Sequence, residues 1–557
     1  MLNRWRNFDK KALLSLLLAL LVALMVSVVG CGNQATTQGN TPAKIIRSTA
    51  SDVPNIDPAI GSDYASSIAL CNLYDTLVFP QNDGTVKPWV ATDWTVSPDG
   101  LTYTFHLRKG VKFHTGKELT ATDVIFSMDR LLAIGQGFSY LYKDVVKSVS
   151  APDPYTVQFV LKRPFGPFVQ SLVRLYIVNQ DEVMAHKQPG NFGTNGDYGE
   201  AWLVSHDAGS GPYTVTELKK EDYMYAKRFP GFWGGWQNGD APDAIQIYGT
   251  TDGATVRTMM ANRQLEQTDQ WQTEENLAAL AKIPGVAIDA AFTGDNLNIM
   301  LNTKKPPTDD VHFRKALAYV FDYNTAVTKL FPGCKKAQGP VPFTLNGFDS
   351  NLPQYTTDLA KAKEELAQSK YADNLAQYPM DIAWISNVPD EEKVALLFQS
   401  DASQLGIKVN IDKMPWLSFV DKVATVEGTP NASIVFMAPD YDEAGSMLYA
   451  RYDSKSCGTW EQTEWLKDPA IDKAIEDALA TQDQAQRFAK YQAIQAKIVD
   501  LCPTIWVFDQ AEKRAYQKAY VDWPGADIDQ QGGRISPVMG YNFYYHDYKV
   551  YPDRIPR

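Results

Sequence analysis

Hydrophobic and polar residues alternate most clearly in the segment 97–130, where the period changes once. A Pro-Asp-Gly turn at 98–100 comes first, and every second residue after it is apolar, as in a half-buried strand: Leu101, Tyr103, Phe105 and Leu107. Thr120 and Asp123 then resemble a capping box, and apolar residues recur at helical spacing: Val124, Ile125, Met128, Leu131 and Leu132. This segment predicts a strand followed by an amphipathic helix.

Similar patterns organise the later half of the chain. Gly406 suits a left-handed helix end, and alternation restarts after it at Ile407, Val409 and Ile411. Asp468 and Pro469 open a helical pattern that continues with Ile471, Ile475 and Leu479. No repeat at solenoid spacing occurs, so the alternating elements predict mixed α/β lobes.

The first 31 residues have the pattern of an export signal. Four basic residues lie in positions 4–11, an apolar stretch covers 12–29, and Val28-Val29-Gly30 precedes Cys31. We expect cleavage before Cys31, lipidation of its thiol, and a flexible polar tether over 31–43. The mature protein would then be anchored to the outer face of the cell membrane or face the periplasm. An uncleaved transmembrane helix is the alternative.

Charge and composition narrow the possible partners. The chain carries 53 basic and 65 acidic residues, and without residues 1–30 the balance is 49 to 64, a net charge of about −15. Such a surface disfavours nucleic acid and anionic membranes but suits small cationic or zwitterionic ligands. A hydrophobic content of 45% excludes a disordered chain.

Reactive and metal-binding residues form no recognisable motif. The six histidines are scattered, and no H-E-x-x-H, G-x-S-x-G or P-loop pattern is present, so we assign no catalytic residue, metal or cofactor. An exported location permits disulfides among Cys71, Cys334, Cys457 and Cys502, but the sequence does not decide their pairing.

Several segments together resemble the family 5 extracellular solute-binding proteins, the peptide and nickel receptors of ABC importers. Besides 97–130, these are NIDPA (55–59), LYDTLV (73–78), GSGPY (209–213), R-x-x-x-FW (228–233), NTKKPPTDDVHFRKALAYVFDYN (302–324), DLAKAKEELA (358–367), LGIKVNIDKMPWLSF (405–419) and MAPDYDEAGSML (437–448). In the segment 302–324, Asp309 and Asp310 precede a helical pattern. The resemblance covers nearly the whole mature chain, and the order of its parts makes it specific.

The resemblance implies a bilobal α/β fold of the periplasmic-binding-protein type (class II) with an inserted subdomain. The core of lobe one would comprise 44–72, 209–295 and 521–557, the inserted subdomain would be 73–208, and lobe two would be 296–520. A ligand would be enclosed when the lobes close.

The resemblance also implies a ligand wall. A short apolar run at 434–438 stops at Pro439, and the peptide receptors of this family use the matching strand to bind the ligand backbone, with an acid at the position of Asp440 for the α-amino group. Trp416 matches a cleft tryptophan. Core packing of Trp416 and a solvated turn position for Asp440 are the alternatives. Phe436, Met437 and Ala438 replace Gly-Trp-Cys of an oligopeptide branch, which leaves the preferred peptide length open.

These features predict the substrate-binding lipoprotein of an ABC importer. It would be a monomer without enzymatic activity that captures peptides by lobe closure and passes them to a permease and its ATPase subunits. A receptor for oligosaccharides or a nickel chelate is the alternative on the same fold. An exported hydrolase is the alternative of another class, because acids distant in sequence can converge in space.

Overall fold

The computed structural model describes residues 44–236, 239–530 and 534–556. The expected signal peptide, Cys31 and the tether lie outside these residues. Within the described part of the chain, no helix is both long enough and apolar enough to cross a bilayer.

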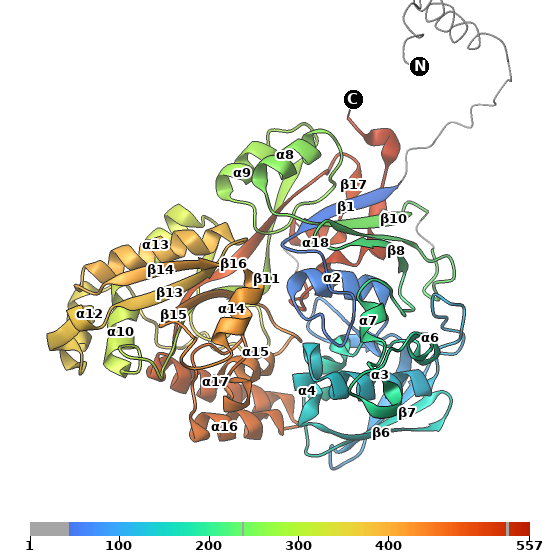
Figure 1. Ribbon diagram of the computed structural model, residues 1–557, viewed down its shortest axis with the longest axis horizontal. Coiled ribbons are helices and arrows are strands. Elements are labelled where there is room, and N and C mark those ends of the chain that lie inside the picture. The colour runs from blue at the N-terminus through green and yellow to red at the C-terminus, as the bar shows by residue number, and fades with distance from the viewer. Residues whose placement is uncertain (1–43, 237–238, 531–533, 557) are drawn as a thin grey trace, which may run out of the picture. The chain divides into compact units, whose positions relative to one another are not determined.

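A four-stranded sheet begins the described chain. Its order is β1 (Ile45–Ala50), β10 (Ala244–Gly249), β9 (Tyr223–Arg228) and β8 (Tyr213–Lys219), with β1 and β10 parallel and the other pairs antiparallel. Helices α8 (Gly253–Ala261) and α9 (Glu274–Leu280) lie beyond its end (Figure 1). Gln267 bridges this sheet to the next one through single pairs with β1 and with Tyr516.

The larger sheet has six strands and contains two unusually long ones. Its order is β12 (Lys335–Lys336), β16 (Thr504–Tyr516), β11 (Ala287–Leu301), β15 (Ala432–Met437), β13 (Met380–Ile385) and β14 (Val409–Met414). β11 and β16 pair antiparallel from Ala287 to Met300, with a register shift after Phe292. These strands run from the region of the first sheet into the six-stranded one (Figure 1).

The strands of the six-stranded sheet carry apolar side chains on both faces. Helices cover both faces and remove these side chains from water. One face packs on α10 (Val311–Val320), α12 (Leu359–Gln368) and α13 (Pro389–Ser403), through residues such as Ile299, Phe313 and Phe398. The other face contributes Val435 and Met437 to the core that includes residues of α14 (Trp416–Val423), α15 (Ala444–Tyr452), α16 (Pro469–Leu479) and α17 (Gln484–Leu501).

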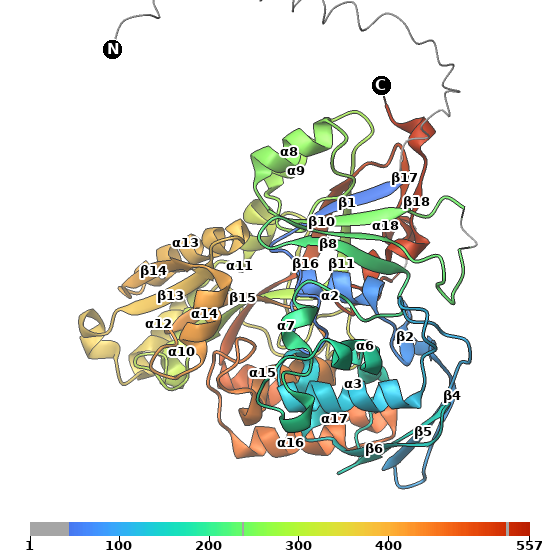
Figure 2. The same cartoon turned by 45° about the vertical axis from the view of Figure 1, so that its right-hand side comes forward.

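The third substantial sheet lies within residues 91–161. Its order is β4 (Ala91–Val96), β5 (Thr102–Leu107), β7 (Thr156–Leu161) and β6 (Val146–Asp153), and all neighbours are antiparallel. Helix α3 (Ala121–Ile134) contacts β6 and β7, and the short α4 (Tyr140–Lys143) follows it (Figure 1). Figure 2 shows α3 beside the strands β4, β5 and β6 of this sheet. The small pairs β2 (Val78–Pro80) with β3 (Val86–Pro88) and β17 (Val521–Asp522) with β18 (Lys549–Val550) complete the sheets.

Several predicted elements are confirmed where predicted. β5 alternates as expected, and α3 begins with the Thr120–Asp123 capping box. The side chain of Asp310 caps α10 by accepting from the Phe313 amide, as expected of an acid at a helix start. Gly406 has a φ of 76°, and Asp468 caps α16. In each case the local sequence carries the signal, because caps and turns depend on neighbouring residues.

Candidate functional site

The loop between β15 and α15 places Asp440 in the interior. The backbone N–H of Asp440 donates to Ser446 Oγ (2.8 Å), and the residue is only 5% exposed. Its carboxylate accepts a hydrogen bond from the Tyr140 hydroxyl of α4. Two segments 300 residues apart therefore meet at this carboxylate.

Arg174 fixes the backbone of the same loop. Its guanidinium is fully buried, with Nε donating to the carbonyl oxygen of Asp440 (2.9 Å) and Nη1 to that of Met539 (2.9 Å). It also lies over the Phe138 ring, 4.7 Å from the centroid. Arg174 thus holds main-chain carbonyls rather than the Asp440 carboxylate.

Neighbouring acids in this segment differ in their partners. Asp442 pairs with Arg534 (2.6 Å) and Glu443 with Arg487 (2.6 Å). Within the described residues, no lysine or arginine forms an ion pair with the carboxylate of Asp440. A buried carboxylate without a cation is costly, so this position favours a cationic group brought by a ligand.

The raised pKa values of two carboxyl groups at this loop also favour a bound cation. Burial raises the pKa of Asp440, while the charge of Arg174 and the Tyr140 hydrogen bond oppose the rise. The pKa of Glu461 is raised well above its ordinary value, first by burial and then by the charge of Asp440, against a hydrogen bond from the same tyrosine. Two carboxyl groups thus share one hydroxyl, and a cation bound there would lower both pKa values.

Trp416 lies at the start of α14 and is half-buried. Its ring stacks on Phe419, with centroids 6.0 Å apart, and meets the Trp460 ring edge-on at 5.1 Å. Since Trp460 directly precedes Glu461, the tryptophan pair adjoins the carboxyl groups along the chain. Trp416 therefore packs on other aromatic rings and still has an exposed part.

The strand β15 presents its predicted residues on two faces. Phe436 and Met437 point to opposite sides of the sheet because successive strand residues alternate. Phe436 is partly exposed and its ring contacts Trp271 at 4.9 Å, whereas Met437 is buried in the core on the α15 side. Ala438 is partly exposed. Four of the five predicted residues thus lie at the end of β15 and in the loop after it, with Phe436 and Met437 on opposite faces, whereas Trp416 lies on α14.

One edge of β15 is only partly occupied. β11 pairs with the strand along its whole length, from Ala432 to Met437. On the opposite side, the register with β13 covers only Ala432 and Ser433. The β13-facing edge of 434–437 has no strand partner among the described residues, and an extended peptide can add to such an edge.

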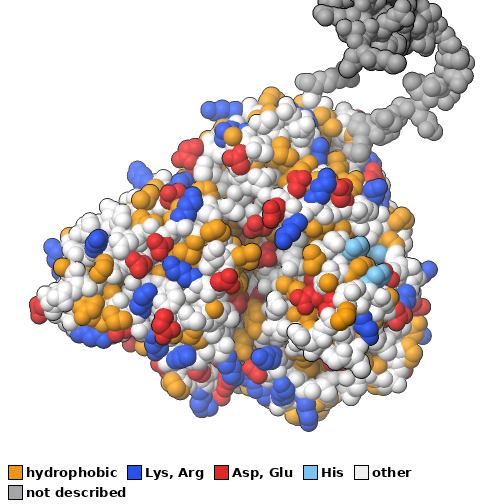
Figure 3. All heavy atoms as spheres, viewed as in Figure 1, with side chains coloured by type: hydrophobic (Ala, Val, Ile, Leu, Met, Phe, Trp, Pro, Cys, Tyr) orange, Lys and Arg blue, Asp and Glu red, His pale blue; other side chains and the backbone are white. Residues whose placement is uncertain are grey.

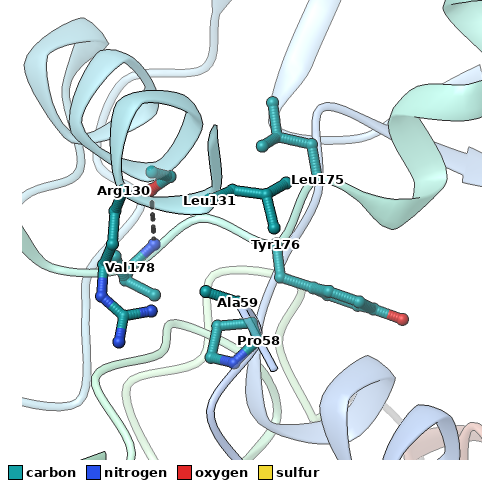
Figure 4. A pocket seen from close by; sticks show the side chains of 8 residues that line it. Pro58, Ala59, Arg130, Leu131, Leu175, Tyr176 and Val178 are labelled. Atoms are coloured by element: carbon teal, nitrogen blue, oxygen red, sulfur yellow. Dashed lines mark hydrogen bonds between the residues drawn. The ribbon is translucent and has the colours of Figure 1, made fainter. Parts of the chain in front are cut away.

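A groove adjoins these elements on the molecular surface. In the space-filling view it separates the side bearing α13 and α14 from the side bearing α3 and α4, and acidic side chains line part of it (Figure 3). A separate cavity lies between α3 and the segment 175–178, where the backbone N–H of Val178 donates to Ser127 Oγ (2.9 Å) and Leu131 lies on one side (Figure 4). Its volume is about 10 Å³, room for one water molecule at most, so it is not a peptide site.

Sequence reasoning missed Tyr140, Arg174 and Glu461. Each lies in a segment without a distinctive motif, and only the tertiary fold brings them to Asp440. In the described chain no three His, Cys, Asp or Glu side chains are arranged to hold a metal ion. The four cysteines that the structure describes, Cys71, Cys334, Cys457 and Cys502, are free thiols.

Comparisons with known proteins find similar solute-binding proteins. The family model of bacterial extracellular solute-binding proteins, family 5, middle region, matches residues 85–458. The probable D,D-dipeptide-binding periplasmic protein DdpA of Escherichia coli K12 is 27% identical and aligns with 84% of this chain and 89% of its own. The periplasmic binding protein DppA of Helicobacter pylori, solved with the peptide STSA, superposes with a TM-score of 0.79 at 23% identity, covering 91% and 98% of the two chains. NikZ of Campylobacter jejuni, solved with Ni(L-His), gives 0.77 at 19% identity, covering 91% and 100%.

Proposed function

The chain belongs to the bacterial extracellular solute-binding proteins of family 5, and from this premise we propose that it captures peptides with a free amino terminus for an ABC importer. The structures that it resembles confirm the bilobal α/β fold predicted from the sequence. Peptide binding is stated in the names of several of its relatives, among them the di/tripeptide-binding protein 2 of Pseudomonas aeruginosa. These relatives support a peptide ligand for this chain.

The observation that carries the proposal is the unpaired carboxylate of Asp440. In the segment 440–443, Asp442 and Glu443 each have an arginine partner, and Asp440 alone has none within the described chain. A peptide α-ammonium supplies the missing cation. The open edge of β15 supports the same ligand, because it offers main-chain groups to an extended backbone.

Capture would proceed by lobe closure without a chemical step. We assign residues 44–72, 209–295 and 521–557, with the insert 73–208, to one lobe and 296–520 to the other. Tyr140 and Arg174 then reach across the cleft to the loop of Asp440, and such contacts favour the closed state once ligand is bound. Outside the cell, a lipid on Cys31 would keep the monomer near its permease.

The test is calorimetry with a free and an N-acetylated form of one peptide. The peptide is the one best retained from an equimolar pool of synthetic di- and tripeptides. Asp440→Asn keeps the shape and removes the charge, so binding of the free form should weaken by about 2–5 kcal/mol. The acetylated form should bind wild type weakly and lose little more in the variant.

Asp442→Asn is the matched control. It removes a carboxylate two residues away that already has Arg534 as its partner. The preference for free over acetylated peptide should survive in this variant. Equal losses for both peptide forms in Asp440→Asn would show that Asp440 does not bind the amine.

A further inference from the structure

The loop between β7 and α5 (Phe168–Ser171) meets the turn that joins α16 to α17. The backbone N–H of Gly166 in this loop donates to the carbonyl oxygen of Leu479 at 2.7 Å. Leu479 is the last residue of α16, and the final carbonyl groups of a helix have no partner within the helix. In both ribbon views α16 lies next to the insert (Figure 1, Figure 2). Gly166 belongs to the proposed insert and Leu479 to proposed lobe two, so this hydrogen bond joins the two lobes.

No side chain fits at Gly166 while the lobes are in contact. The φ of Gly166 lies outside the left-handed region, so the local backbone accepts an alanine. A Cβ there, however, would lie 2.5 Å from the carbonyl oxygen of Thr481 and closer still to Nη1 of Arg487. Both of these atoms belong to proposed lobe two. The contact between the lobes therefore requires this glycine, whereas the fold of the insert does not.

A second glycine of the insert meets the same turn. Gly100 ends the Pro-Asp-Gly turn before β5 and has a φ of 68°. A Cβ at Gly100 would lie 2.8 Å from Nε2 of Gln482. The turn 480–483 thus contacts the insert at two separate points.

Arg487 joins this turn to the ligand loop. It is buried, and its Nη1 donates to the carbonyl oxygens of Thr481 (2.8 Å) and Gln482 (3.1 Å). Its Nε and Nη2 donate to the carboxylate of Glu443 at 2.9 Å and 2.6 Å. Glu443 follows Asp440 by three residues. Because the guanidinium is a rigid planar fork, a displacement of the turn is passed on to the loop that carries Asp440.

We propose that the loop of Gly166 and the turn 480–483 form a clasp that holds the closed lobes together, and that Arg487 couples this clasp to the ligand loop 440–443. The inference rests on the proposed function and adds two positioning residues, Gly166 and Arg487. In the open state the Gly166 N–H and the Leu479 carbonyl bind water instead, so the clasp forms only on closure. Because closure follows entry of the peptide, the clasp slows peptide release and leaves the rate of capture unchanged.

Gly166→Ala tests the clasp, because it places one methyl group between the lobes and removes no polar atom. Association and dissociation rates are measured by stopped-flow tryptophan fluorescence, with the free-amine peptide selected above. Dissociation from Gly166→Ala should be about 10- to 100-fold faster than from wild type, the equivalent of overpacking by one methyl group, with association within a few-fold. Hydrogen exchange of residues 162–168 should slow in wild type when peptide saturates the protein, and should slow less in the variant.

Gly428→Ala is the matched control. The φ of Gly428 also lies outside the left-handed region, and a Cβ there would crowd the carbonyl oxygen of Lys422. Gly428 and Lys422 both belong to proposed lobe two, so the crowding is the same in the open and closed states. Gly428→Ala should lower the thermal midpoint of the ligand-free protein and leave the dissociation rate within a few-fold of wild type. Gly166→Ala should do the reverse.

Arg487→Lys tests the link between the clasp and the ligand loop. Lysine keeps a cation beside Glu443 but cannot also bind both carbonyl oxygens of the turn. If Arg487 carries the coupling, Gly166→Ala should speed dissociation less in the Arg487→Lys background than in wild type. Effects of the two substitutions that simply multiply would overturn the role of Arg487.

The possible outcomes distinguish the clasp from the proposed function. A wild-type dissociation rate in Gly166→Ala would overturn the clasp and leave peptide capture intact. Hydrogen exchange of 162–168 that peptide does not change in wild type would overturn the clasp too. Retention of no peptide at all by wild type would overturn the proposed function, and this inference with it.

Discussion

Replacing Arg174 by methionine should weaken ligand binding as well as lower the stability of the ligand-free protein. The guanidinium makes two good bonds to carbonyl oxygens, those of Asp440 and Met539, at 2.9 Å each. A third contact, to Pro439 at 3.5 Å, is too long to count. Hydrogen bonds involving a charged group contribute about 1.5–3 kcal/mol each. Only the bond to Asp440 joins the two proposed lobes, because Met539 belongs with Arg174 to proposed lobe one, so this bond stabilises the closed arrangement by about 1.5–3 kcal/mol.

Loss of a hydrogen bond between the lobes lowers ligand affinity, whereas loss of a hydrogen bond within one lobe lowers the stability of the ligand-free protein. Arg174 belongs to the proposed insert of lobe one, and Asp440 belongs to proposed lobe two. If opening of the lobes breaks the Asp440 bond, water solvates these groups in the open state and the cost of the substitution falls on the closed, ligand-bound state. Affinity should then fall by about 10- to 100-fold, the equivalent of that one bond.

Arg228→Met is the control for loss of a guanidinium that binds main-chain carbonyl oxygens within one lobe, although Arg228 is only half-buried. Arg228 also donates to carbonyl oxygens, those of Ala241 and Pro242, and pairs with Asp243 (2.9 Å), but all these partners belong to the first sheet region. It should lower the thermal midpoint and leave affinity within a few-fold of wild type.

Calorimetry, thermal unfolding and small-angle scattering together test the reasoning. Wild type should show a smaller radius of gyration with saturating peptide than without, and Arg174→Met should need far more peptide for the same contraction. Unchanged affinity in Arg174→Met, with a thermal midpoint lowered as in Arg228→Met, would refute a closing role for Arg174.

Three further predictions concern other parts of the chain. Cys31→Ser should prevent lipidation and processing, and a wild-type-like lipidated product from that variant would contradict the signal assignment. Affinity for a free-amine peptide should fall as pH drops through the raised pKa of Asp440, because only the ionised carboxylate attracts the ammonium; a flat calorimetric profile between about pH 4 and pH 8 would count against it. Burial lowers the pKa of His114, but the charge and the hydrogen bond of Asp207 outweigh burial, and the pKa of His114 is raised. The protonated His114 therefore stabilises the folded protein. This contribution to the free energy of unfolding is full below about pH 6.5 and is lost as pH rises through the folded-state pKa. His114→Gln should therefore lower the thermal midpoint most near about pH 5–6.5, and an equal deficit at all pH values would exclude this linkage.

Local elements were predictable from the sequence because their signals are local. The cap at Thr120, the glycine at 406 and the alternation of β5 each involve residues within a few positions of one another. The family resemblance added the position of Asp440, which no periodicity marks. The resemblance therefore indicated the loop on which the proposed peptide site is built.

The partners of that loop were not predictable. Tyr140 and Arg174 precede Asp440 by more than 260 residues, and nothing in their own segments indicates that they face it. The contrast between Asp440 and Asp442 was equally hidden, because it depends on Arg534 arriving from near the end of the chain. The tertiary fold decides which of several adjacent acidic residues remains without a cationic partner.

The identity of the bound ligand tests the central claim most directly. Protein purified from cells grown in peptide-rich medium is denatured, and the released small molecules are analysed by mass spectrometry. The account predicts peptides with a free amino terminus in wild type, and far less peptide in Asp440→Asn. Recovery of oligosaccharides or a metal chelate instead would contradict it.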